Sequence, residues 1–239
     1  MAKSATEYFE EGLDLEHAGR YKRAIQKYTL ALQQDPTHYE TLLRLFDHAM
    51  IEHDIAQARK LAVKIEKYYP KHSTPYLVWV QVLIEEEKFQ EANDRLKEFY
   101  DLDLRGYEED FRYTNLLNQF SIDCLMGMED YEQAVKDLQM MIVQEPLDEV
   151  TQDVALEYLE ELEQEMGHSE EFLVVLGHVL RFHRDRSLEY AEDHDTFMRN
   201  HPSIRADVEY NFMLAKEEQL DRYARQALRR DDGEEEENG

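Results

Sequence analysis

A short pattern that recurs every 34 residues constrains this chain more than any other feature of its sequence. A large apolar residue stands three positions before an alanine at Tyr21–Ala24, Ile55–Ala58 and Phe89–Ala92, and the interval is 34 residues both times. Pro36 and Pro70 keep the same interval. Periods of about 20–50 residues are typical of repeat proteins, in which each unit buries its apolar surface against its neighbours. We therefore expect a stack of similar units.

A fourth copy of the pattern and the scarcity of turn residues extend this prediction. Tyr131–Ala134 lies 42 residues after the third copy and closes at Pro146, so about eight residues are inserted near 101–110. Only 8 glycines and 5 prolines occur in 239 residues. A sandwich or barrel, which needs a turn about every 8–12 residues, would require more of them. The chain is therefore predicted to be mostly helical.

The first unit resembles the tetratricopeptide repeat (TPR) family, whose unit is two antiparallel helices, A and B, in about 34 residues. Phe46 and Val80 depart from the pattern by replacing the small helix-A residue, and Ala62 and Leu96 replace the helix-B aromatic. The resemblance covers about residues 5–148 and implies an all-α, right-handed α-solenoid of helical hairpins. The agreement in the first unit lies at Tyr8, Gly12, Gly19, Tyr21, Ala24, Tyr28, Ala31 and Pro36.

The whole chain is predicted to consist of repeats followed by a helical C-terminal part. We place four TPR-like repeats at about 5–38, 39–72, 73–106 and 115–148, degenerate helical repeats and a capping helix in 149–230, and a disordered acidic tail in 231–239. The capping helix, 203–229, has its apolar face at Ile204, Val208, Phe212, Ala215, Leu220, Ala224 and Leu228. The helix over 148–166 has its core stripe at Val150, Val154, Tyr158, Leu162 and Met166.

Several helix ends are marked by capping residues. Ser4 and Thr37 each precede a glutamate by three residues, which is the spacing of a capping box. Thr74 precedes a proline, a pattern typical of an N-cap followed by the first helical residue. Gly167 is expected to end one helix and Ser169 to begin the next.

The negative charge of the chain is regional. The net charge is -27, yet residues 1–71 carry 11 basic and 11 acidic side chains, whereas residues 72–180 carry 6 basic and 27 acidic ones. Such a field repels phosphate backbones, so no nucleic acid is expected as a partner, and basic proteins are favoured. Acid that served only solubility or a salty cytoplasm would be spread evenly, although this simpler role stays an alternative.

The helix predicted over 148–166 carries a row of carboxylates at four-residue spacing. We interpret this row as an acidic docking face for a basic protein, with a solvated, salt-screened face as the alternative. Its members are Glu149, Asp153, Glu157, Glu161 and Glu165.

No constellation of residues predicts an enzyme, a metal site or a cofactor site. Asp101 and Asp103 begin like a calcium loop, but Arg105 and Arg112 stand where ligands should be. Cys124, the single cysteine, lies between apolar residues, which predicts a buried, unreactive thiol and no intrachain disulfide. No apolar stretch suggests membrane insertion and the N-terminus does not resemble a secretion signal, so a cytoplasmic location is expected.

The family resemblance also implies a binding surface, because helix A of each repeat lines the concave groove of TPR proteins. The Lys, Asn and Arg clamp that some members use for a C-terminal carboxylate is missing from the corresponding positions. The same residues could instead pack against neighbouring repeats or a second chain. The groove positions singled out are Phe9, Leu13, Leu43, Asp47, Met50, Leu77, Gln81, Ile84, Gln119 and Asp123.

These observations predict a non-catalytic adaptor or chaperone that binds a peptide or helix of another protein. The groove suits apolar anchors with a few basic residues. One alternative is a structural subunit that uses the groove for self-association as a homo-oligomer or for complex assembly. The other is an enzyme, which would have to copurify with a metal or cofactor.

Overall fold

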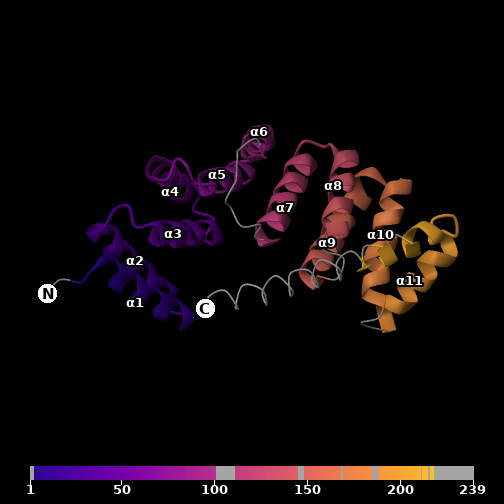
Figure 1. Cartoon of the computed structure of the whole chain (residues 1–239), viewed down its shortest axis with the longest axis horizontal. Helices are drawn as coiled ribbons and strands as arrows, with labels where there is room; N and C mark the ends of the chain where they lie inside the picture. The colour runs from indigo at the N-terminus through magenta and orange to yellow at the C-terminus, as the bar shows by residue number, and fades with distance from the viewer. Residues whose placement is uncertain are drawn as a thin grey trace, which may run out of the picture. The chain divides into compact units, whose positions relative to one another are not determined.

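The computed structural model describes residues 3–100, 111–144, 148–167, 169–184, 188–210, 212–214 and 216–217, without the side chains of 111–115 and 188–190. All regular structure in this part of the chain is helical, so the all-α prediction is confirmed (Figure 1). The chain divides into two compact units, Met1–Tyr107 and Glu108–Gly239. The predicted insertion at 101–110 and the acidic tail at 231–239 lie outside the described residues.

Unit 1 consists of three consecutive helical hairpins, as the 34-residue period predicts. Within each hairpin the A helix packs on the B helix, and α2 then packs on α3 and α4 on α5. The hairpins are α1 (Ala5–His17) with α2 (Tyr21–Gln34), α3 (Tyr39–Ile51) with α4 (Ile55–Tyr68), and α5 (Thr74–Glu85) with α6 (Phe89–Tyr100).

Unit 2 begins with a fourth hairpin and continues into packing that the repeat pattern does not specify. Helix α8 packs on α7 and α9, α10 contacts α8, α9 and α11, and residues 205–210, 212–214 and 216–217 are helical after α11. The helices are α7 (Phe111–Gly127), α8 (Tyr131–Gln144), α9 (Glu149–Met166), α10 (Glu170–Arg184) and α11 (Leu188–Asn200).

The turn inside each of the four hairpins has the same geometry, although its sequence varies. Gly19, His53, Glu87 and Glu129 all have positive φ, between 53° and 69°. The residue after each one donates its backbone N–H to the carbonyl five positions earlier, at 2.8–2.9 Å. This bond satisfies a carbonyl that the helix end leaves unpaired. The fourth hairpin therefore has the same turn as the first three, although most of the consensus residues are absent from its sequence.

Gly12 shows why the first hairpin matches the pattern best. A Cβ at this position would lie 2.3 Å from Cε1 of Tyr28, whose ring is fully buried. Helices α1 and α2 therefore approach closely because glycine leaves room for the tyrosine ring. The neighbouring hairpin has no such pair: Phe46 and Ala62 stand at the equivalent positions, and both are buried in its core. In the second hairpin the large residue is on the A helix and the small one on the B helix, the reverse of the first hairpin, so the volume of the pair is similar.

Charged side chains also hold successive hairpins of unit 1 together. Arg59 on α4 donates to both carboxylate oxygens of Glu86, with Nε 2.7 Å from Oε1. Glu66 on α4 accepts from Nε1 of Trp79 at 3.0 Å and from Arg95. Bidentate arginine pairs have directional geometry as well as charge. These contacts fix the third hairpin against the second.

A further helix, here called the terminal helix, begins at residue 205. Its start packs on α10 and α11 and covers apolar side chains of both. Ile204, Val208 and Phe212 are buried. Gly177 on α10 allows this close packing, because a Cβ there would lie 2.8 Å from Cγ2 of Val208. The described part of the predicted capping helix thus packs as expected, whereas residues 218–229 lie outside the described residues.

The expected helix ends and starts are confirmed at three places and wrong at two. Ser4 forms the predicted capping box, Gly167 ends α9 with φ 69°, and the Ser169 hydroxyl accepts from the backbone N–H of Phe172 at 3.1 Å. The capping box at Thr37 is wrong: Asp35 accepts the backbone N–H of Thr37 at 2.9 Å instead, and α3 begins two residues later, at Tyr39.

The N-cap predicted at Thr74 is also wrong. Ser73 is the N-cap of α5, and Thr74 is already helical. The side chain of Thr74 bonds to the hydroxyl of Tyr39 on α3. A contact with the preceding hairpin therefore replaces the local cap.

The predicted core stripe of α9 is correct only at its C-terminal end. Val150 is 66% exposed, Val154, Tyr158 and Met166 are half-buried, and only Leu162, the fourth member of the stripe, is fully buried. The physical reason is that a strict four-residue spacing advances about 40° per step around a helix with 100° per residue. The stripe therefore winds from solvent into the core. The buried side is formed by Thr151, Gln152, Ala155, Leu159 and Leu162.

Candidate protein-binding surface

The A helices of unit 1 present the predicted groove positions with graded exposure. Phe9, Leu13, Gln81 and Ile84 are half-buried, and Asp47 has 53% of its side chain exposed. The ring of Phe9 lies 5.7 Å from that of Tyr28. Spacings of four and three residues place these positions on one side of each A helix. The set is thus partly accessible and partly in contact with the hairpins that carry it.

Three of the predicted positions contribute to the core. Leu43 and Met50 are half-buried and pack against the cluster around Phe46, and Leu77 is only 6% exposed. Phe9, Leu13 and Ile84 are half-buried as well, and Ile51, four residues after Asp47, is 74% exposed. Accessible apolar surface on this side therefore comes from Ile51 together with the half-buried positions.

A polar network connects the first two hairpins beside these residues. The hydroxyl of Tyr28 donates to Oε2 of Glu16 at 2.5 Å, and Nε2 of His48 lies 3.5 Å from the same oxygen. Arg44 lies 3.8 Å from Oε1 of Glu16. Burial acts to raise the pKa of Glu16, but the tyrosine hydrogen bond and Arg44 outweigh it and lower the pKa. Burial together with this bond raises the pKa of Tyr28.

Asp47, one turn from Arg44, combines exposure with poor solvation. Its carboxylate lies 3.9 Å from Arg44, yet desolvation by its surroundings dominates and raises the pKa of Asp47. Glu16 adds to the rise by repulsion. A carboxylate in this state gains more from a further cation than one in open water does.

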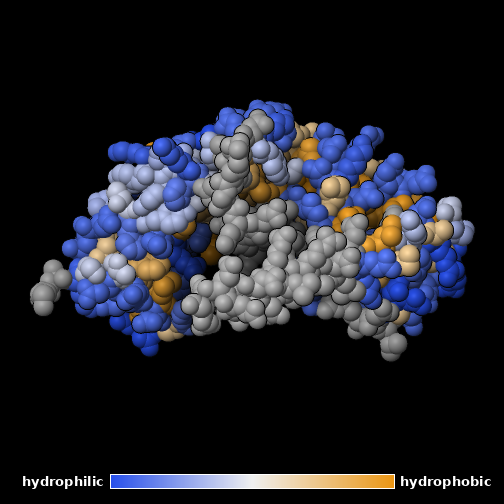
Figure 2. All heavy atoms as spheres, viewed as in Figure 1, coloured by the Kyte–Doolittle hydropathy of each residue, from blue (hydrophilic) through white to orange (hydrophobic). Residues whose placement is uncertain are grey.

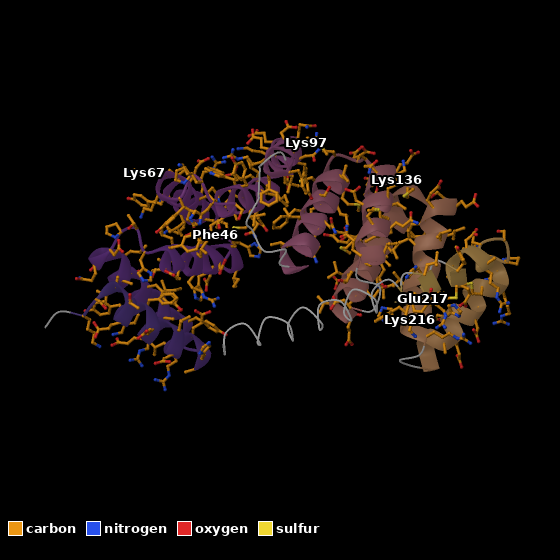
Figure 3. The ribbon with its side chains drawn as sticks, viewed as in Figure 1. Phe46, Lys67, Lys97, Lys136, Lys216 and Glu217 are labelled. Carbon is orange, nitrogen blue, oxygen red and sulfur yellow. The ribbon has the colours of Figure 1, made fainter. Side chains whose placement is uncertain are left out.

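The helices of the first two hairpins separate charge between the A side and the B side of the repeat. Helix α1 carries five carboxylates and no Lys or Arg, whereas α2 carries three cations and no carboxylate. Helix α4 carries four cations against Glu66 alone. Figure 3 labels Lys67 on α4, which is exposed. The charge sum of residues 1–71, which is zero, conceals this separation until the helices are assigned to the A or B side.

The equivalent side of unit 2 is formed by α7 and α9. The hydroxyl of Tyr158 donates to Oδ1 of Asp123 at 2.6 Å and to the backbone carbonyl of Gln119 at 3.3 Å. Burial raises the pKa of Tyr158 and of Asp123, and repulsion from Glu161 raises that of Asp123 further. The sequence does not signal this pair, because it joins two helices 35 residues apart.

The acidic docking face predicted on α9 is exposed at all five carboxylates. It lies opposite the buried side of the helix, and its four-residue spacing makes it wind, as the apolar stripe does. Oδ1 of Asp153 consequently lies 3.6 Å from Nε2 of His183 on α10, whereas Glu165 accepts a long hydrogen bond of 3.5 Å from Tyr131 at the start of α8. Glu157 and Glu161 lie in the middle of the row and are exposed. On the face drawn in Figure 2, the surface of unit 2 is hydrophilic with hydrophobic patches between the polar residues.

The described residues hold no cluster of metal-ligating side chains, and their one cysteine is buried. No group of three or more His, Cys, Asp or Glu side chains within them could hold a metal ion. Cys124 is buried, and desolvation raises the pKa of its thiol to about 12, so the thiol is protonated near neutral pH. None of the described helices is long and apolar enough to span a bilayer.

Consecutive two-helix hairpins with a common turn define a helical repeat protein. Residues 15–77 match the model of the tetratricopeptide repeat family, and this part of the chain is therefore TPR sequence. The match extends from the end of α1 to the start of α5. No curated protein matches the chain.

Solved structures show the same fold over most of the chain. A thermophilic TPR protein of Thermus thermophilus has a TM-score of 0.54 at 16% identity, over 81% of this chain and 98% of its own. The pilF protein of Pseudomonas aeruginosa has a TM-score of 0.51 at 16% identity, over 86% and 95%. A TPR protein of Parabacteroides merdae gives 0.53 at 11%, over 89% and 84%. The chain thus has the fold of TPR proteins, including the part beyond the sequence match.

Proposed function

We propose that the chain is a non-catalytic adaptor or chaperone that binds a peptide or helix of a partner protein on the A-helix side of unit 1. The TPR fold supports a role in protein–protein interaction. The finer proposal concerns the partner: a segment with apolar anchors and at least one Lys or Arg. Phe9, Leu13 and Ile84 offer partly accessible apolar surface for the anchors.

The observation that carries this proposal is the excess of carboxylates on the A helices of the first two hairpins. Helix α1 has five carboxylates and no Lys or Arg, and Asp47 on α3 has 53% of its side chain exposed, with Arg44 3.9 Å away. A Lys or Arg of a partner would add opposite charge to this side, and the raised pKa of Asp47, caused by desolvation and by repulsion from Glu16, acts in the same sense. The acidic face of α9 supports a basic partner in the same way, by charge alone.

A selection of peptides on the intact chain tests the proposal without knowledge of the partner. Random peptides displayed at neutral pH and low salt should yield sequences with apolar residues at helical spacing and a Lys or Arg. The change Asp47→Lys should weaken a selected peptide at least tenfold, because it places like charges together. Glu132→Lys, an exposed change of the same charge at the start of the B helix α8, is the matched control and should bind as the unmodified chain does.

Unchanged affinity and salt dependence in the Asp47→Lys protein would refute the role of this surface. The self-association alternative is checked on the same sample by measuring its mass over a hundredfold range of concentration. A dimer that Asp47→Lys dissociates would assign the surface to assembly instead of to a partner.

A further inference from the structure

The outer side of α4 carries a row of lysines that have no carboxylate partner among the described residues. Lys60, Lys64 and Lys67 are all exposed, and none of them forms an ion pair with a described residue. Nζ of Lys67 lies 5.3 Å from the centre of the Tyr68 ring. Like charges three and four residues apart destabilise a helix. Such a row is unexpected in a chain that has 54 acidic and only 27 basic side chains.

The three lysines lie on the side of α4 that faces away from the core. At 100° per residue, Lys60, Lys64 and Lys67 fall within about 60° of one another around the helix. Val63, which is 50% exposed, borders them. We call these four residues the lysine ridge. The buried side of the helix is formed by Ala58, Leu61, Ala62 and Ile65.

The other two charged residues of α4 are engaged with the third hairpin. Arg59 donates to both carboxylate oxygens of Glu86, and Glu66 accepts from Arg95. Glu66 lies about 120° around the helix from Lys60, so its carboxylate is directed toward the third hairpin and away from the lysines. The positive charge of the lysine ridge is therefore not compensated by its own helix.

Helix stability does not account for this row either. Lys67 lies in the last turn of α4, where the helix dipole favours a cation. That effect is limited to the last turn and does not reach Lys60 or Lys64. On the next B helix, α6, Lys97 lies 3.7 Å from Asp94, so that cation has a partner on its own helix. Lys60 and Lys64 have neither a dipole nor a carboxylate to explain them.

Charge determines the class of ligand that the lysine ridge can bind. The ligand must be anionic. A nucleic acid or a charged bilayer presents many negative charges to a chain whose net charge is -27, and a second copy of the chain brings the same charge again. A short acidic segment of a protein brings only a few charges. At physiological ionic strength, charges of the chain more than about 8 Å from such a segment are largely screened.

We propose that the lysine ridge is a docking surface for an acidic segment of a partner protein. Successive lysines are separated by about 4.5–6 Å along the helix axis. Carboxylates on alternate residues of an extended segment are about 6.6 Å apart, so the flexible lysine side chains can meet them one to one. Val63 offers a contact to an apolar residue of the segment. The proposal concerns a B helix and holds whether or not a cationic segment binds the A helices.

Binding of an acidic peptide to the intact chain tests the proposal. The probe is a fluorescent peptide in which glutamates alternate with serines around one leucine, and the same peptide with glutamines is its control. Anisotropy at an ionic strength of about 0.01 M, where the Debye length is about 30 Å, should show binding of the glutamate peptide only. Lys60→Glu with Lys64→Glu should weaken this binding at least tenfold, because attraction becomes repulsion. Lys60→Arg with Lys64→Arg keeps the charge and should keep the affinity within about twofold.

A matched pair of changes separates a local effect from an effect of net charge. Lys97→Glu with Lys136→Glu alters the net charge equally, at exposed lysines of the B helices α6 and α8 that Figure 3 labels. This pair should change the affinity by less than about threefold. No binding of the glutamate peptide to the unmodified chain, or an equal loss in both glutamate pairs, would overturn the proposal.

The other anionic ligands are outcomes of the same comparison. Vesicles of phosphatidylcholine with phosphatidylserine, and a single-stranded RNA, are tested on the same proteins. Tighter binding to either of them than to the peptide, lost in Lys60→Glu with Lys64→Glu, would assign the lysine ridge to that ligand and overturn the proposal. A mass that rises with concentration in the unmodified chain but not in this pair would assign it to a second copy instead.

Discussion

At the scale of single residues, the four hairpin turns share a backbone conformation with positive φ, and only one of them has glycine, the residue that favours it, at that position. Gly19 adopts its positive φ without strain, whereas His53, Glu87 and Glu129 hold φ values of 53°, 57° and 61° with a Cβ present. A non-glycine residue in this region costs about 1 kcal/mol. The structure therefore retains three small costs at equivalent positions.

Replacing each of these residues by glycine should stabilise the chain. His53→Gly, Glu87→Gly and Glu129→Gly are each expected to raise the free energy of unfolding by about 0.5–1 kcal/mol, because relief of strain exceeds the added freedom of the unfolded chain. Chemical denaturation measures the change, and Gly19→Ala should lower stability by a similar amount. A loss on all three substitutions would show that the imidazole and carboxylates make contacts worth more than the strain.

Gly12 has the opposite requirement, since space and not backbone angle makes glycine necessary there. Gly12→Ala places a methyl group within 2.3 Å of the buried Tyr28 ring. Overpacking of this kind costs about 1–3 kcal/mol. The melting temperature should therefore fall. We also expect the displaced Tyr28 ring to lose its hydrogen bond to Glu16, which would lower the pKa of Tyr28 and shift the tyrosine absorbance titration toward lower pH. An unchanged melting temperature would mean that α1 and α2 can separate at little cost.

At the scale of elements, the terminal helix rests on a buried histidine. His178 on α10 is 5% exposed, its Nε2 has no hydrogen-bond partner among the described residues, and its ring lies 5.2 Å from that of Phe212. Desolvation lowers the pKa of His178 to about 4. His178 therefore becomes protonated near pH 6.5 in the unfolded chain but only near pH 4 in the folded chain.

Because of this histidine, the free energy of unfolding decreases as the pH falls from about 6.5 to 4. Its contribution is complete above pH 6.5 and is lost as the pH drops toward 4, by about 3 kcal/mol in total. His178→Leu should keep stability at pH 7.5, because no bond to Nε2 from the described residues is lost, and should flatten the decline between about pH 6.5 and 4. Denaturation at several pH values compares the two proteins, and parallel curves would rule out His178 as the titrating group.

The helices themselves were largely predictable from sequence, but their rotation and contacts were not. The 34-residue period and the prolines place the hairpins, since both are local and repeated. A phase error arose in α9, because a row with four-residue spacing looks straight in the sequence and winds by about 40° per step in the helix. The Asp123–Tyr158 bond and the core burial of Leu77 depend on the neighbouring helix, which no local pattern specifies.

At the scale of the whole molecule, the chain consists of two compact units with separate cores. The core of unit 2 extends from Ile122 to Val179, and a satellite cluster of Met198, Ile204 and Val208 closes its C-terminal side. Loss of the terminal helix should therefore be felt in unit 2 first.

Truncation tests this division. Deletion after Pro202 removes Ile204, Val208 and Phe212, whose burial contributes about 1.5–3 kcal/mol each before entropy losses. Hydrogen exchange should accelerate throughout α10 and α11 and leave α1–α6 unchanged. Deletion after Arg230 removes only polar residues and glycine and should cost almost nothing. Equal stability of the shorter protein would show that these helices need no cap.

The charge separation within unit 1 has a consequence for how partners arrive. A body with carboxylates on α1 and cations on α2 and α4 has a dipole across its hairpins even where its charges sum to zero. A diffusing cationic segment is turned toward α1 before any contact forms, and an anionic one toward α2 and α4. Each side thus favours encounters with segments of the opposite charge. Added salt would lower the association rate at both sides without changing the shape of either surface.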